Sequence, residues 1–156
     1  MANGMQQDER EILQHNLYYQ IELTARRVKL HGQQVLASHG IDITIDQWLI
    51  VRFLLDKKDV NQLTIGEELY KDKPTISRMI QKLEKKGWII KRKSDVDARE
   101  MVINLTADGR RWAKEMLPMI QQIRADGLDA LTLEEKQQLS QALGKIRKSL
   151  ATRSSE

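Results

Sequence analysis

Apolar residues recur at helical spacing along most of the chain, beginning with a stretch from about residue 8 to residue 38. Its apolar positions lie four, four, four and three residues apart, at Leu13, Leu17, Ile21, Ala25 and Val28. This spacing predicts one long helix with a single apolar stripe, which at 1.5 Å per residue would extend about 45 Å. A small domain cannot cover so long a stripe, so the pattern predicts that a partner chain covers it.

Two shorter helices are expected next. Thr44 or Asp42 begins a helix that continues to about Lys57 and is apolar on several sides. Thr64 and Glu67 match a capping box, in which a Ser or Thr N-cap is followed three residues later by Glu. A short third helix is therefore expected to begin at Thr64.

The following helix, over about 72–84, is apolar on one side and polar or basic on the other. Its apolar residues have the i, i+3, i+4, i+7 spacing of a buried stripe and are Ile76, Met79, Ile80 and Leu83. The opposite side carries Thr75, Arg78, Lys82 and Lys85. Two short helices joined by a tight turn predict a helix-turn-helix, in which the second helix enters the major groove of DNA.

Beyond Gly87 the pattern becomes strand-like. Residues 88–92 and 101–105 are rich in β-branched and apolar side chains, and a polar stretch separates them. A hairpin that follows a helix-turn-helix forms a winged helix. Thr106 then begins a helix to about residue 126.

The fold class predicted is mostly α with a small β-hairpin wing, a winged helix-turn-helix between long terminal helices. Thr132 and Glu135 form a further capping box that begins a last helix to about residue 150. The chain, 1–156, is expected to be one domain in which 41–105 bind DNA and in which 8–40 and 106–150 form a homodimer. A two-fold dimer would contact a pseudo-palindrome with half-sites about 34–36 Å apart, or a multiple of that distance.

The position of the basic residues along the chain supports this interpretation more than the net charge of the chain does. The segment from Lys71 to Lys93 holds nine basic and two acidic side chains, whereas the whole chain has a net charge of +4. The sequence contains no cysteine, which excludes disulfides, thiol redox sensing and cysteine-based zinc sites. There is no signal-peptide pattern and no apolar run long enough to span a bilayer, so a cytoplasmic protein is expected.

Four linked motifs resemble the MarR family of bacterial transcription regulators. They are Asp72-x-Pro74-Thr75-Ile76-Ser77-Arg78, Leu83-Glu84-x-x-Gly87-Trp88-Ile89, Asp97-x-Arg99 and Leu105-Thr106-x-x-Gly109. The match extends from about residue 46 to residue 109, and the long terminal helices suit the dimerisation arms of the family. One departure is that Ala98 replaces the first arginine of the Asp-Arg-Arg that the wing often carries.

The resemblance implies that the DNA contacts come from the recognition helix and the wing. The residues of the helix are Lys73, Pro74, Thr75, Ser77, Arg78, Gln81 and Lys82, and those of the wing are Lys91, Arg92, Lys93, Asp97 and Arg99. Arg78 suits guanine and Gln81 suits adenine, whereas Thr75 and Ser77 suit phosphate or a thymine methyl group. For Lys82, Lys85 and Lys86, a solvated helix end that complements the helix dipole is the alternative.

Arg99 is the sharpest prediction in the wing. A narrow minor groove concentrates negative potential and attracts an inserted arginine. Asp97 can hold that guanidinium with a charge-assisted hydrogen bond before DNA is bound. The alternative is an ordinary surface ion pair of little consequence.

Many relatives release DNA when a small molecule, often aromatic or phenolic, binds near the arms. The corresponding candidates here are Tyr18, Tyr19, His31, Trp48, Arg52 and Trp112. The alternative for the two tryptophans is a place in the core, and Arg52 either needs an anionic partner or extends to the surface. His15, His31 and His39 lack the spacing of a metal site, so neither a metal nor a cofactor is expected.

Three classes of function remain to be compared. A dimeric DNA-binding repressor accounts for Arg78, Gln81 and the wing together. A winged helix that binds an acidic protein partner is the alternative for the basic surface. An enzyme is not supported, because the sequence has no phosphate-binding loop, nucleophile elbow or clustered carboxylate–histidine set.

Overall fold

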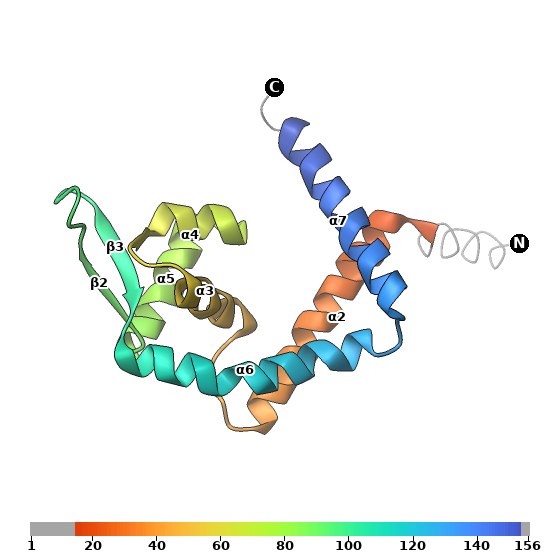
Figure 1. Cartoon of the computed structure of the whole chain (residues 1–156), viewed down its shortest axis with the longest axis horizontal. Helices are drawn as coiled ribbons and strands as arrows, with labels where there is room; N and C mark the ends of the chain where they lie inside the picture. The colour runs from red at the N-terminus through yellow and green to blue at the C-terminus, as the bar shows by residue number, and fades with distance from the viewer. Residues whose placement is uncertain (1–14, 154–156) are drawn as a thin grey trace, which may run out of the picture. The chain divides into compact units, whose positions relative to one another are not determined.

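The computed structural model describes residues 15–153, which divide into two compact units between Ile120 and Gln121. The elements are α2 (Leu17–Ser38), α3 (Ile45–Asp56), β1 (Val60–Asn61), α4 (Gln62–Leu69), α5 (Lys73–Lys85), β2 (Ile89–Lys93), β3 (Met101–Leu105), α6 (Ala107–Leu128) and α7 (Leu133–Arg153) (Figure 1). Helices dominate this part of the chain and one small sheet accompanies them. The predicted fold class is therefore confirmed.

The first described helix is shorter than the sequence predicts. α2 begins at Leu17, because Asn16 is extended, with φ −77° and ψ 110°, and its side chain accepts the backbone N–H of Tyr19. An asparagine N-cap thus interrupts the single helix that was expected from residue 8, and Asp8 itself lies outside the described residues. The end of α2 agrees with the prediction: the helix stops at Ser38, and Gly40 has φ +69°.

The capping of α3 confirms the sequence interpretation, whereas that of α4 corrects it. Thr44 and Gln47 form a reciprocal capping box at the start of α3. α4 begins two residues before Thr64, because Asn61 is its N-cap and accepts the backbone N–H of Thr64 at 2.8 Å. The capping box that the sequence suggested between Thr64 and Glu67 is therefore wrong.

The sheet has the strand order β1-β3-β2, and both pairings are antiparallel. β2 and β3 form the predicted wing, with Ile89 opposite Leu105 and Lys93 opposite Met101. In Figure 1 this hairpin extends beyond α3, α4 and α5. β1 was not predicted, since its two residues are a strand only through their pairing with β3.

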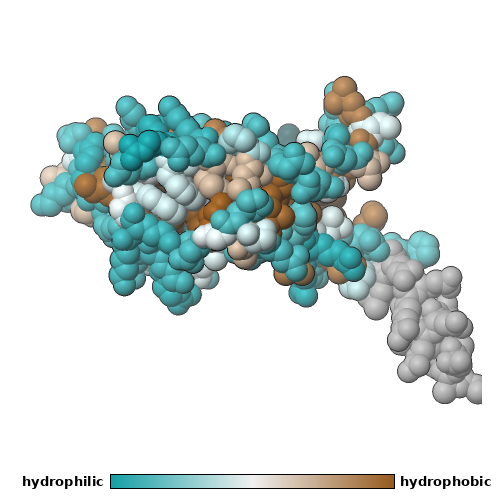
Figure 2. All heavy atoms as spheres, turned by 90° about the horizontal axis from the view of Figure 1, so that it is seen from below, coloured by the Kyte–Doolittle hydropathy of each residue, from teal (hydrophilic) through white to brown (hydrophobic). Residues whose placement is uncertain are grey.

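The core of the first unit lies where α3, α4 and α5 pack against the sheet. The fully buried aliphatic residues of these three helices are Ile50, Val51, Leu54, Ile65, Ile76, Ile80 and Leu83. The face shown in Figure 2 is mainly hydrophilic, with one hydrophobic patch near its centre and smaller hydrophobic spots elsewhere. Apolar packing thus fixes the position of α5, which leaves its other side free for function.

The last two helices begin as expected. Thr106 accepts the backbone N–H of Gly109 at the start of α6, and Thr132 and Glu135 form a reciprocal capping box before α7. Within residues 15–153, none of the helices combines the length and the apolar character that crossing a membrane requires.

Candidate nucleic-acid interface

α5 has the two-sided character that its sequence predicts. Ile76, Ile80 and Leu83 are fully buried, and Met79 is half-buried beside them. On the other side, the predicted DNA-contacting residues are exposed or half-buried: Lys73, Pro74, Thr75, Ser77, Arg78, Gln81 and Lys82. Pro74 occupies the first turn, where a missing N–H costs no helical hydrogen bond.

The N-terminus of α5 carries a short polar relay. The carboxylate of Asp72 accepts the backbone N–H of Thr75 at 2.7 Å and its hydroxyl at 3.0 Å. The same hydroxyl accepts Nη2 of Arg78 at 3.3 Å. The backbone hydrogen bond from Thr75 is the largest cause of the lowered pKa of Asp72. Asp72 therefore stays ionised and, through Thr75, orients the Arg78 guanidinium.

The lysines at the end of α5 differ in their surroundings. Lys86 forms an ion pair with Asp42 at 2.8 Å and lies 5.3 Å from the ring centroid of Trp88. Its hydrogen bond is the largest cause of the lowered pKa of Asp42. Lys82 and Lys85 are exposed. With Lys86 they line a groove of about 360 Å³ whose other residues are Asp42, Thr44 and Gln47.

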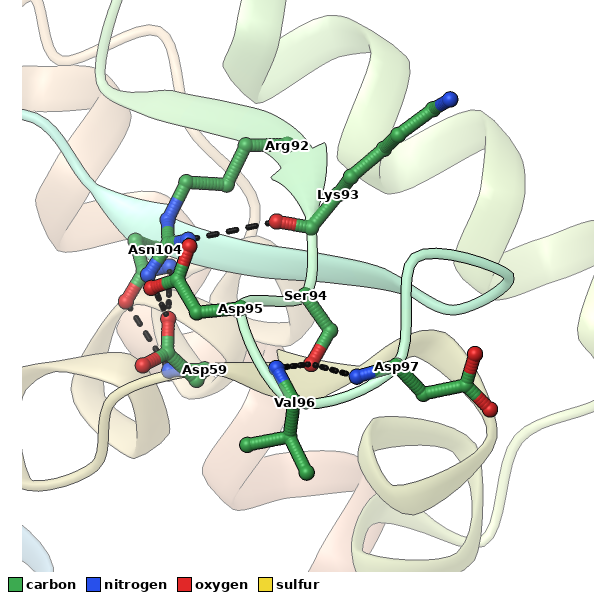
Figure 3. Close-up of polar contacts among 8 residues, drawn as sticks. All are labelled: Asp59, Arg92, Lys93, Ser94, Asp95, Val96, Asp97 and Asn104. Carbon is green, nitrogen blue, oxygen red and sulfur yellow. Dashed lines mark hydrogen bonds and ion pairs between the residues drawn. The ribbon is translucent and has the colours of Figure 1, made fainter.

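The basic residues of the wing divide into paired and unpaired side chains. Lys91 lies 3.8 Å from Glu84, and Arg92 forms ion pairs with Asp59 and Asp95. Lys93 is exposed, and Figure 3 shows its side chain directed away from Asp59 and Asp95. The Lys93 ammonium is therefore available to a binding partner, whereas the Arg92 guanidinium is already paired with two carboxylates.

The turn of the wing corrects one expectation. The carboxylate of Asp97 accepts the backbone N–H of Arg99 at 2.9 Å, and no ion pair joins it to the Arg99 guanidinium among the described contacts. Ser94 stabilises the same turn by accepting the backbone N–H groups of Val96 at 3.2 Å and Asp97 at 3.4 Å (Figure 3). Asp97 therefore shapes the turn, and the exposed Arg99 side chain projects from it.

The residues that the sequence missed lie outside the basic segment or have the opposite charge. Asp59, in the segment between α3 and β1, holds Arg92 and is itself hydrogen-bonded to Asn104 of β3. Asp95 holds Arg92 from the wing turn. No local signal identifies Asp59, because it is 33 residues away from Arg92.

The candidate effector residues have unlike surroundings. Trp48 is 2% exposed, and its ring contacts that of Trp112, with a centroid distance of 6.1 Å and an interplanar angle of 66°. Trp112 also stacks on Trp88 at 3.8 Å. The core alternative thus holds for Trp48. Arg52 is paired with Asp56 one turn later on α3, so its charge has a partner at the partly exposed surface.

The other candidates lie on α2. Tyr18 and Tyr19 are exposed in its first turn, and His31 is half-buried further along. The groove at the end of α5 contains none of the six candidates. Among the described residues, no group of three or more His, Asp or Glu side chains is arranged to hold a metal ion.

Comparison with known proteins identifies relatives along most of the chain. Residues 43–101 match the model of the MarR family. The transcriptional repressor MprA of Escherichia coli is 29% identical over 137 residues, which are 83% of this chain and 77% of MprA. The organic hydroperoxide resistance transcriptional regulator of Bacillus subtilis is 27% identical over 131 residues, 84% of this chain and 86% of that protein.

A solved structure has the same fold. The MepR protein of S. aureus, crystallised in complex with DNA, superposes with a TM-score of 0.75 at 24% sequence identity. The match covers 86% of this chain and 98% of MepR. The shared fold includes the winged helix on which the predicted contacts lie.

Proposed function

We propose that the chain is a transcription regulator of the MarR family, and that it represses transcription by binding a pseudo-palindromic duplex as a homodimer. The observation that carries the proposal is the arrangement of α5. Its buried isoleucines fix it against the core, while Arg78, Gln81 and Lys82 are exposed on the other side. A helix held in this way can enter the major groove without rearrangement of the core.

In the proposed complex, α5 supplies the base contacts. Arg78, oriented by Thr75, suits the O6 and N7 atoms of guanine, and Gln81 suits adenine. Lys73, Ser77 and Lys82 suit phosphate oxygens, which set the register of the helix on the duplex. Pro74 and the methyl group of Thr75 offer apolar contact to a thymine methyl group.

The wing supplies a second set of contacts. Arg99 is exposed beyond the turn that Asp97 shapes, and it suits a narrow minor groove. Lys93, at the end of β2, is also exposed and suits a phosphate. Lys91, paired with Glu84, is a weaker candidate, because a phosphate would have to compete with a carboxylate.

The homodimer is proposed to form through the terminal helices. Exposed apolar side chains lie along α2 at Leu17, Ile21, Val28 and Leu30 and along α7 at Leu133, Leu139 and Leu150. A second copy of the chain would remove them from water. The proposed DNA-binding role also implies a cytoplasmic location, because the bacterial chromosome lies there. This role involves no catalytic step.

Control by a small aromatic or phenolic molecule is part of the proposal. Tyr18, Tyr19, His31, Arg52 and Trp112 are accessible enough to contact such a molecule, whereas Trp48 would act from the core. A thiol cannot be the sensor, because the sequence has no cysteine.

Selection of duplexes from a random pool tests the proposed function. The wild-type protein should enrich a pseudo-palindrome, and its affinity should fall steeply with salt if several lysines contact phosphate. Lys82→Ala should weaken binding to the selected and random duplexes alike. Arg99→Ala should weaken binding to the selected duplex more and should remove the preference for A·T pairs in the flanks.

Two results would contradict the proposal. Failure to enrich any sequence, together with a flat response to salt, would favour the acidic protein partner instead. Unchanged affinity of Arg99→Ala for the selected duplex would show that Arg99 does not contact DNA and would leave α5 as the source of the sequence-specific contacts.

A further inference from the structure

The guanidinium of Arg92 is held near the base of the wing by two acids from other segments and by a carbonyl of its own strand (Figure 3). Nη2 lies 2.7 Å from Oδ1 of Asp59, and Nη1 lies 2.9 Å from Oδ1 of Asp95. Nη1 also donates to the backbone carbonyl of Lys93 at 3.2 Å. One side chain of β2 thus links the connector before β1 to the start of the wing turn.

Asp59 is itself fixed in place. Its backbone is left-handed, with φ 54°, and its N–H donates to Oδ1 of Asn104 at 2.9 Å. Nδ2 of Asn104 donates in return to Oδ1 of Asp59, also at 2.9 Å. We call Asp59, Arg92, Asp95 and Asn104 the wing-base cluster. Asp59 is thus held by β3, whereas Asp95 belongs to the wing turn.

The turn beyond this cluster is exposed. Val96 is 98% exposed, and a hydrogen bond of 2.9 Å from the Ser94 N–H to the Glu100 carbonyl closes the turn on itself. The ion pair between Arg92 and Asp95 ties the turn to the wing-base cluster. This ion pair connects the cluster to the turn that carries Arg99.

The charges of the wing-base cluster disfavour a DNA phosphate as a partner for Arg92. Two carboxylates surround one guanidinium, so the cluster has a net negative charge. A phosphate would have to displace one carboxylate while approaching the other. Asp59 and Asp95 already provide Arg92 with the charge-assisted hydrogen bonds that a phosphate would offer.

We infer that Arg92 is a positioning residue: through Asp59 and Asp95 it sets the angle of the wing for the minor groove, and it does not itself contact DNA. This inference rests on the proposed function. It assigns the two acids a positive part in DNA binding, although carboxylates near DNA ordinarily oppose it.

Substitution of Asp59 distinguishes a phosphate-contacting Arg92 from a positioning Arg92, because the two roles predict opposite changes in DNA affinity. Asp59→Asn preserves the shape of the side chain, and asparagine tolerates the left-handed backbone. If Arg92 contacted phosphate, removal of the carboxylate would free it and strengthen binding. If Arg92 positions the wing, affinity for the selected duplex should fall about fivefold, whereas affinity for random duplex should not fall. Tighter binding to the selected duplex would overturn the inference.

The salt dependence gives an independent readout, with Lys93→Gln as the matched control for Arg92→Gln. Both substitutions remove one charge from neighbouring residues of β2. Loss of a phosphate contact lowers the slope of log K against log salt by about 0.9 per contact, or about 1.8 per homodimer. Lys93→Gln should lower the slope in this way. Arg92→Gln should weaken binding and leave the slope unchanged, and a reduced slope would contradict its positioning role.

A measurement without DNA separates failure of this inference from failure of the proposed function. The sequence has no cysteine, so Val96→Cys provides one site for a nitroxide label. Asp59→Asn and Arg92→Gln should each increase the mobility of that label, whereas Lys93→Gln should not. Unchanged mobility would overturn the role of the wing-base cluster. Failure of the wild-type protein to enrich any duplex would instead overturn the proposed function.

Discussion

At the scale of single residues, Gly109 occupies a place that has no room for a side chain. A Cβ atom built on it would lie 2.0 Å from the carbonyl oxygen of Trp88. The same carbonyl accepts the backbone N–H of Thr106 at 3.0 Å, and the Thr106 hydroxyl donates to the carbonyl of Gly87 at 2.6 Å. The start of α6 therefore packs directly against the backbone that leads into the wing.

Gly109→Ala should lower the free energy of unfolding by about 2–3 kcal/mol, because backbone on both sides must move to admit the methyl group. Gly127→Ala is the matched control in the same helix, since a Cβ there would meet nothing within 4 Å. It should raise the free energy of unfolding by about 0.5 kcal/mol. Urea denaturation measures both changes, and equal effects of the two substitutions would refute the steric explanation.

Sequence identifies the candidate residues of the interface better than it identifies their partners. The amphipathic pattern predicts the exposed position of Arg78 on α5 because that pattern is local. The pairing of Arg92 depends on Asp59, which only the fold brings to the wing. The family resemblance therefore predicts Arg92 as a DNA contact, whereas its surroundings favour a positioning role.

At the scale of elements, the accuracy of the sequence interpretation follows the range of the interactions involved. α5 was predicted well because its N-cap Asp72, Pro74 and the terminating Gly87 are local signals. α4 was predicted to begin too late. Asn61 and Thr64 are both good N-cap residues. Asn61 of β1 pairs with Val102 of β3, and this pairing favours Asn61 as the N-cap. The residues alone do not contain that pairing.

Asp46 links three elements of the first unit and makes their packing depend on pH. Its Oδ2 lies 2.7 Å from Nζ of Lys29 on α2 and 3.4 Å from Nζ of Lys71 after α4. Burial alone would raise the pKa of Asp46, but the hydrogen bonds and charges of the two lysines outweigh it and lower the pKa. A carboxyl with a lowered folded-state pKa stabilises the fold above its unfolded pKa, and this contribution disappears as pH falls through the folded value.

Asp46→Asn should therefore lower the free energy of unfolding at pH 7 by about 0.5–1 kcal/mol. The difference from wild type should shrink as the pH falls below about 4, the ordinary range for an aspartate. Glu22→Gln provides the control, because Glu22 pairs with Arg26 on the exposed surface of α2. Urea titrations at several pH values provide the measurement. A difference that persists unchanged at low pH would show that the charge of Asp46 is not its cause.

At the scale of the whole molecule, the proposed binding of a pseudo-palindrome by the wing and α5 requires a defined distance between two copies of the chain. Val28 is 61% exposed and Leu17 is 75% exposed, although both are apolar positions of the stripe on α2. Burial of such side chains by a second copy would couple folding to association. Stability would then depend on protein concentration.

A tenfold increase in protein concentration should raise the Tm by about 2 °C if two chains unfold and separate together. Val28→Asp should remove this dependence and give the mass of one chain in sedimentation, whereas the neighbouring Arg27→Ala should change neither. On a duplex with both half-sites, Val28→Asp should lose about a hundredfold in affinity, because the second winged helix no longer benefits from linkage to the first. Its affinity for an isolated half-site should stay the same, since α5 and the wing are unaltered. A dimeric mass and an unchanged Tm dependence for Val28→Asp would place the interface elsewhere on the chain.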